Sequence, residues 1–128
     1  MDYYLTKFVD LGFDESVQKI TEELKKVGFG ILTEIDVKQT FKNKINADFR
    51  DYKILGACNP KFAYEVLQAE NKAGVLLPCS VVIQKHDNNQ VEISIMDLVP
   101  LMRVVNNPTM NKFAEDVKVL LSKALGNC

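Results

Sequence analysis

Two apolar segments on either side of a short polar stretch constrain the fold of this chain more than any other feature. Residues 76–85 and 91–97 are rich in Val, Ile and Leu, and HDNNQ between them has the composition of a turn. This pattern predicts a β-hairpin.

The apolar faces of the two arms predict the register of the hairpin. Facing residues in an antiparallel hairpin have a constant sum of residue numbers, and a slip of one residue turns every side chain over. Both conditions hold when Ile83 faces Ile93, which brings Cys79 opposite Asp97 on the inward face. A two-position shift would instead bring Val81 opposite Asp97, so a thiol and a carboxylate lie near each other in either register.

Two interpretations of this pair stay open. A free cysteine often packs as a small hydrophobic residue, and Asp97 can cap the turn that follows it. Alternatively, the thiol and the carboxylate form part of a site at a strand end. A metal shared with His86, the single histidine, is excluded, because Cys79 and His86 are about 23 Å apart along a strand. We expect His86 to be exposed in the turn, which leaves a Cys-His or Ser-His catalytic pair without a base.

The rest of the chain predicts three further strands and several helices. The strands are residues 4–9, about 30–37 and 52–58; the helices are 14–27, 37–46, 60–73 and 108 to about 125. Residues 96–107 are less clear and allow a helical turn from Pro100. The expected fold is therefore a single α+β domain, 1–128, with a mostly antiparallel sheet of about five strands and helices packed on one face.

Asparagine and aspartate mark the expected helix starts. Asp14 is expected to cap the first helix, and Asp36 the second, with Gln39 reaching back. Asn59-Pro60 and Asn107-Pro108 each combine an N-cap residue with proline at the first helical position.

Alternation in GILTEIDV predicts that Ile31, Thr33 and Ile35 share one side of a strand. Leu32, Glu34 and Asp36 then share the other side. A leucine among acids suggests that this side is covered by a partner subunit, so we expect a homodimer.

Cys58 stands immediately before a predicted helix start. A thiol at a helix N-terminus can have a lowered pKa, because the thiolate meets the positive end of the helix dipole. The alternative is that Asn59 is the cap and Cys58 is the last strand residue, facing the core. Cys58 and Cys79 can meet only if their strands are antiparallel neighbours.

Bulk properties exclude several function classes. With 16 Lys+Arg against 17 Asp+Glu, the net charge is -1 and the lysines are scattered, so we expect no nucleic-acid partner. No basic amphipathic segment indicates a membrane surface, and Pro78 interrupts the longest apolar run. With no signal peptide and three cysteines, the expected compartment is the cytoplasm.

Four stretches together resemble the bacterial domain-of-unknown-function family numbered 302. They are GFGILTEIDV (28–37), YKILGACNP (52–60), LLPCSVVI (76–83) and MDL (96–98). The resemblance implies a small α+β fold similar in shape to the TATA-binding protein repeats, and it implies no activity. The family often has proline directly after the aspartate of its M-D stretch, whereas here Leu98 and Val99 precede Pro100.

The resemblance also marks positions for a candidate site. Glu34 and Asp36 fall in the family's T-E-I-D stretch, Cys58 and Asn59 in A-C-N-P, Cys79 in L-P-C and Asp97 in M-D. These six residues are the candidate ligand-binding set, with Cys58 and Cys79 as candidate metal ligands; no cofactor is indicated.

Three functions remain open. The favoured one is a binding module that holds a small ligand or a thiophilic metal in a strand-end cleft. The alternatives are a thiol-dependent enzyme or redox protein that uses Cys58, and a homo-oligomeric structural module without a small-molecule site.

Overall fold

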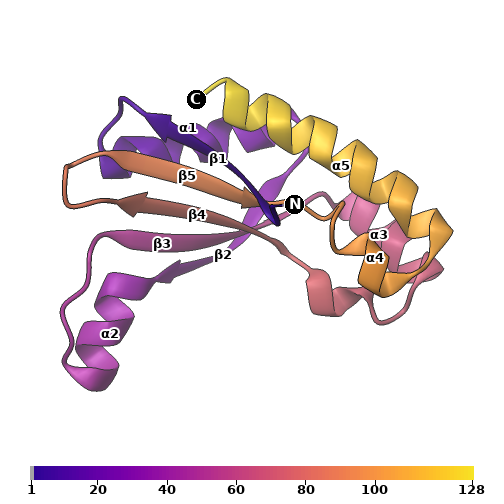
Figure 1. Ribbon diagram of the computed structural model, residues 1–128, viewed down its shortest axis with the longest axis horizontal. Coiled ribbons are helices and arrows are strands. Elements are labelled where there is room, and N and C mark those ends of the chain that lie inside the picture. Colours follow the sequence, from indigo (N-terminus) through magenta and orange to yellow (C-terminus); the bar gives the residue numbers. More distant parts are fainter. Residues whose placement is uncertain (1) are drawn as a thin grey trace.

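Five strands form one antiparallel sheet in the computed structural model, which describes residues 2–128 (Figure 1). They are β1 (Tyr4–Val9), β2 (Gly30–Asp36), β3 (Tyr52–Cys58), β4 (Cys79–Lys85) and β5 (Val91–Met96). The order across the sheet is β1-β5-β4-β3-β2, and every neighbouring pair is antiparallel. The predicted α+β class is confirmed.

Two long helices cover one face of this sheet, and the other helical segments lie at its two ends (Figure 1). The covering helices are α1 (Phe13–Lys26) and α5 (Pro108–Gly126). Helix α2 (Val37–Ile45) follows the end of β2, whereas α3 (Pro60–Ala69), the 3₁₀ turn η1 (Ala73–Leu76) and α4 (Met102–Val105) gather near the N-terminal half of α5.

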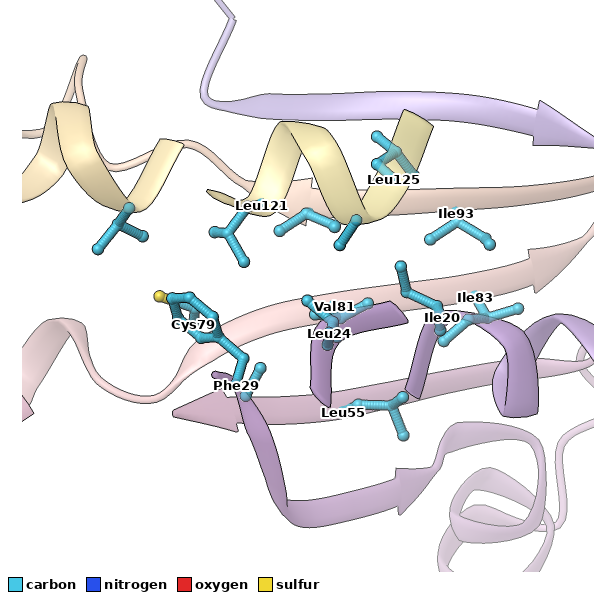
Figure 2. Close-up of a cluster of buried hydrophobic side chains, with 14 of the residues drawn as sticks. Ile20, Leu24, Phe29, Leu55, Cys79, Val81, Ile83, Ile93, Leu121 and Leu125 are labelled. Carbon is cyan, nitrogen blue, oxygen red and sulfur yellow. The ribbon is translucent and has the colours of Figure 1, made fainter. Parts of the chain in front are cut away.

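The main core lies between the sheet and the two covering helices (Figure 2). Ile83 pairs with Ile93 and Val81 pairs with Ile95, so the predicted hairpin register is confirmed. All four side chains are fully buried. A second, smaller cluster joins Val66, Ala73, Met102, Met110 and Ala114 at the end of the sheet.

Capping residues place most helix starts where the sequence predicts them. The side chains of Asp36, Asn59 and Asn107 each accept a backbone N–H in the first turn of their helices. The prediction for Asp14 was wrong: Gly12 is the N-cap of α1, and Asp14 lies in the first turn. Gln39 donates to Asn43 instead of reaching back to the cap.

Helix α3 is shorter than predicted. It ends at Ala69, and the segment expected to continue it, together with the expected start of β4, is a loop that contains η1. The strand itself begins only at Cys79. Leu76 instead packs against the second apolar cluster, so tertiary contacts hold it out of the strand.

A β-bulge in β2 overturns the predicted sidedness of that strand. Ile31 pairs with Ala57, but Thr33 pairs with the adjacent Gly56, so Leu32 is an extra residue. Ile31 therefore faces the helices, whereas Thr33 and Ile35 face the other side of the sheet. Leu32 lies in the bulge and is 66% exposed.

Candidate functional site

Antiparallel pairing of β3 and β4 brings the two cysteine stretches together. Ala57 pairs with Cys79 in the ladder, so the end of β3 lies beside the start of β4. This is the arrangement that the sequence left open. Cys58 and Cys79 consequently border one cavity, which we call the strand-end cavity.

The strand-end cavity lies between this end of the sheet and helices α3, α4 and α5, and its volume is about 40 Å³. Its lining is apolar apart from Cys58, Asn59 and Cys79. The largest apolar side chains in the lining are Phe29, Phe62, Met102, Met110 and Phe113. Figure 2 shows Cys79 beside Phe29. Both residues belong to the main core and also line the cavity.

Cys79 is buried and carries a neutral thiol at physiological pH. Only 3% of the residue is exposed. Burial raises the pKa of the Cys79 thiol to about 11, and the nearby Cys58 contributes to the increase. Since the thiolate is the nucleophilic form, Cys79 is a poor nucleophile.

Cys58 is half-buried beside the start of α3, where Asn59 already uses the helix donors. The Asn59 carbonyl oxygen Oδ1 accepts hydrogen bonds from the backbone N–H groups of Lys61 (3.1 Å) and Phe62 (3.2 Å). These amides would otherwise be available to stabilise a thiolate. The interpretation of Asn59 as the cap and Cys58 as the last strand residue is confirmed.

The turn after α1 approaches Asn59 closely, which explains the glycine there. Gly28 has a φ of 90°, and a Cβ at this position would lie 2.9 Å from Asn59 Nδ2. The chain turns through Gly28 directly into Phe29, which lines the cavity. A side chain at Gly28 would therefore disturb both the turn and the cap of α3.

Asp97 lies near this end of the sheet but does not line the cavity. One carboxylate oxygen accepts the N–H of Val99 at 3.0 Å, and the other lies 3.0 Å from Lys118 Nζ on α5. Its backbone N–H donates to the carbonyl oxygen of Tyr3 at 2.8 Å. Both oxygens are thus engaged, and the turn-capping interpretation of Asp97 is confirmed.

Glu34 and Asp36 lie away from the cavity, towards the other end of β2. Glu34 is an exposed partner of Lys53, with Oε1 3.0 Å from Nζ, and this hydrogen bond raises the pKa of the Lys53 ammonium group. Asp36 caps α2 through the N–H of Gln39 at 3.0 Å. The six candidate residues therefore do not form one site: Cys58, Asn59 and Cys79 meet, and the three acids do not join them.

His86 follows the end of β4 in the turn, as predicted, but its side chain is only partly exposed and has a partner. Its Nε2 lies 2.9 Å from Glu92 Oε1, and its ring packs near Phe8. Strand β4 is continuous from Cys79 to Lys85, which confirms that Cys79 and His86 cannot share a metal.

The sequence reasoning missed the helical side chains that close the cavity. Phe62 follows the predicted cap of α3, and Phe113 lies on the predicted apolar face of α5. Met102 lies in the stretch that had no clear pattern. Apolar periodicity indicated burial for Phe113, but it gave no sign that these three side chains would border a cavity.

Across residues 2–128, no helix has the length and apolarity needed to cross a membrane. In the same part of the chain, no three His, Cys, Asp or Glu side chains are grouped closely enough to hold a metal ion. The two cysteines at the cavity therefore have no third side chain of these four types beside them in the described part of the chain.

Comparisons with known proteins agree on the family. A search of curated proteins found no match. Among solved structures, an uncharacterised conserved DUF302 protein from Bacillus stearothermophilus is 29% identical, with a TM-score of 0.93 over 100% of this chain and 99% of that one. The family model described as "Domain of unknown function DUF302" matches residues 5–128. The chain therefore belongs to the DUF302 family, a family of unknown function.

Proposed function

We propose that this chain is a binding module that holds a small, uncharged, apolar molecule in the strand-end cavity. The observation that carries the proposal is the lining: two thiols and one amide stand among side chains that are otherwise apolar. Small-molecule sites are mostly apolar and contain a few polar groups that orient the ligand.

The charge of the lining supports an uncharged ligand. No Asp, Glu, Lys, Arg or His lines the cavity, and burying an unpaired charge in such a place is costly. The Asn59 carbonyl oxygen is occupied by the start of α3, so its Nδ2 group and the two thiols are the polar contacts that remain.

The size of the cavity limits what enters without rearrangement. A single water needs about 10–15 Å³ on this scale, so a cavity of about 40 Å³ holds only a few atoms. Met102 and Met110 line it, and methionine side chains change rotamer readily. Helix α4, which carries Met102, is 4 residues long. An aromatic ring would therefore fit only after the side chains of these methionines move and enlarge the cavity.

A thiophilic metal is the second candidate, because two sulfurs border the same cavity. Removing the proton from Cys79 at pH 7 costs about 5 kcal/mol, since its pKa is raised to about 11 and each pKa unit is worth about 1.4 kcal/mol. The metal would have to offset this cost without a third His, Cys, Asp or Glu ligand close by among residues 2–128. The apolar ligand requires neither.

A thiol-dependent enzyme has less support. Cys58 has no histidine beside it, because the single histidine in the sequence is paired with Glu92 beyond the other end of β4. The α3 amides are engaged by Asn59.

The cytoplasmic location and the lack of a nucleic-acid partner stay predictions.

Methyl NMR with toluene as the probe tests the proposal. The methyl groups of Met102 and Met110 line the cavity, whereas Met96 lies in β5 outside it. Saturable shifts at Met102 and Met110, without a matching shift at Met96, are expected. The absence of saturable shifts, or equal shifts at all three, contradicts the proposal.

A matched pair of variants on α3 locates the binding. Ala63 lines the cavity, and Ala69 is an exposed residue of the same helix. Ala63→Leu fills the space and is expected to weaken toluene binding at least about tenfold, while Ala69→Leu leaves it unchanged. Saturable uptake of Cd²⁺ that is lost in Cys58→Ser and Cys79→Ser, without toluene binding, would favour the metal instead.

A further inference from the structure

The register of β3 and β4 places Cys58 and Cys79 one diagonal step apart in the sheet. Ala57 pairs with Cys79, and Cys58 is the next residue along β3. With about 4.8 Å between strands and about 3.3 Å per residue, the Cα atoms of the two cysteines are about 6 Å apart. This separation lies within the range of about 4.4–6.8 Å that is usual for Cα atoms joined by a disulfide.

The two cysteines border the same space, although alternation along a strand would separate them. Successive residues of a strand face opposite sides, so in the middle of a longer strand Cys58 would face away from Ala57 and from its partner Cys79. Cys58 is instead the last residue of β3, directly before the cap of α3, and Cys79 is the first residue of β4. Both line the strand-end cavity, and the nearby Cys58 contributes to the raised pKa of the Cys79 thiol. Two free thiols therefore share one apolar space.

The thiols of the pair differ in their access to solvent. Cys58 is half-buried, whereas only 3% of Cys79 is exposed, so a reagent that enters from solvent meets Cys58 first. The third cysteine, Cys128, follows the opposite end of α5 from α3 and α4 (Figure 1), and its Sγ donates to the Ala124 carbonyl oxygen at 3.5 Å. Because Cys128 does not line the cavity, it provides an internal reference for the reactivity of the pair.

We propose that Cys58 and Cys79 form a dithiol site that reacts with small disulfides and closes to an intramolecular disulfide. In the first step, the Cys58 thiolate attacks one sulfur of the small disulfide, a bond forms between that sulfur and Cys58 Sγ, and one small thiolate leaves. In the second step, Cys79 loses its proton and its sulfur attacks Cys58 Sγ, which expels the second small thiolate. The protein loses two electrons and two protons, and the small disulfide is reduced to two thiols.

The raised pKa of the Cys79 thiol slows its reaction with dissolved disulfides more than its reaction with Cys58. With a pKa of about 11, about one Cys79 thiol in a thousand is ionised at pH 8, so Cys79 is a poor nucleophile towards a dissolved reagent. The mixed disulfide on Cys58 is held beside Cys79, and such proximity raises the effective concentration of a reaction partner by orders of magnitude. Cys58 is therefore the attacking cysteine and Cys79 the resolving one.

The disulfide would close the segment of chain that forms one wall of the cavity. Residues 59–78, between the two cysteines, contain α3 and η1, and Phe62, Val66 and Leu76 of this segment line the cavity. Closing a loop of about 20 residues lowers the entropy of the unfolded chain. The oxidised protein is therefore expected to unfold at a Tm about 5–15 °C higher than the dithiol protein. Neither step of the reaction involves a ligand in the cavity, so this proposal is independent of the proposed function.

Reaction of the reduced full chain with bis(2-hydroxyethyl) disulfide, a small uncharged probe, tests the proposal. After the reaction, the remaining thiols are blocked with N-ethylmaleimide in denaturant, and the protein is cleaved with trypsin without reduction. The peptides 54–61 and 73–85, which carry the two cysteines, are expected to be found linked to each other. Dithiothreitol is expected to release both peptides, and thermal unfolding followed by circular dichroism measures the rise in Tm.

Three serine variants separate the steps of the reaction. Cys128→Ser is the matched control and is expected to form the linked peptides as fast as the wild type. Cys79→Ser is expected to stop with one half of the probe bound to Cys58, and Cys58→Ser is expected to leave Cys79 unmodified. A wild type in which the mixed disulfide on Cys58 accumulates without closure overturns the proposal. Linkage of Cys128 to either member of the pair in place of the expected link, a link that forms only when urea has unfolded the chain, or a linked protein with a lower Tm than the dithiol protein overturns it as well.

Discussion

A single added methyl group at Gly56 is expected to destabilise the fold where β3 packs against Pro78, just before β4. Gly56 lies in β3, one residue before Ala57, and the chain packs tightly over it. A Cβ there would meet Thr33 Oγ1 and would lie 2.7 Å from Pro78 Cγ, whereas ordinary contact begins at 3.4 Å. Thr33 can rotate its hydroxyl group away, but the proline ring is rigid, so β3 and the start of β4 must separate by about 0.7 Å.

The magnitude follows from two opposing effects. Overpacking of this kind costs about 1–3 kcal/mol, and replacing glycine by alanine recovers about 0.4–1 kcal/mol by restricting the unfolded chain. Gly56→Ala is therefore expected to lower the free energy of unfolding by about 1–2 kcal/mol. For a chain of 128 residues, this lowers Tm by roughly 5 °C.

Gly30 provides a matched control on the neighbouring strand. A Cβ at Gly30 would meet no atom within 4 Å, so only the effect on the unfolded chain remains. Gly30→Ala is expected to be neutral or to stabilise by about 0.5 kcal/mol. Urea unfolding followed by circular dichroism, at equal protein concentrations, measures both. A Gly56→Ala protein as stable as wild type, or an equal loss in Gly30→Ala, would refute the reasoning.

Three further predictions concern the residues around the cavity. The pKa of the Cys79 thiol is raised from 9.0 to about 11, so between pH 9 and pH 11 the thiol ionises only in the unfolded chain. The free energy of unfolding should therefore fall by about 2–3 kcal/mol over this pH range. Urea titrations across pH should show this fall in the wild type and not in Cys79→Ala. Asp97→Ala removes both the hydrogen-bond acceptor of Val99 and the ion-pair partner of Lys118, and it should lower the free energy of unfolding by about 2–3 kcal/mol. Asp97→Asn should lower it by only about 1 kcal/mol, because the lost ion pair involves the half-exposed Lys118. Equal losses of the two variants in urea unfolding would contradict this. Asn59→Ala should cost about 1 kcal/mol of stability and Asn59→Asp much less, since aspartate also caps a helix; thermal unfolding of both checks it.

The hairpin shows how far local pattern reaches in this chain. The alternation of apolar residues predicted that Ile83 faces Ile93, and the structure confirms it, because only one register buries both apolar faces. The Asn-Pro pairs predicted the starts of α3 and α5, because a cap is satisfied by the next three residues. Features of this kind depend on atoms close together in the sequence.

The bulge in β2 shows where local pattern fails. GILTEIDV alternates, but the pairing with β3 skips Leu32. Ile31 and Thr33, which were predicted to share one side of the strand, therefore face opposite sides of the sheet. Strand pairing decides such a bulge, since the extra residue is defined only relative to a partner strand. The loop before Cys79 is similar, because contacts of Leu76 with the second cluster hold it out of the strand.

The sequence by itself determined most of the elements and helix caps, the α+β class and the family, because periodicity, capping chemistry and sequence motifs are properties of neighbouring residues. Only the tertiary structure decided that β3 and β4 are antiparallel neighbours, that Cys58 and Cys79 consequently border one cavity, and that Glu34, Asp36 and Asp97 do not join them. The physical reason is that strand order and cavities arise from packing between segments far apart in the chain, where many arrangements satisfy the same local pattern.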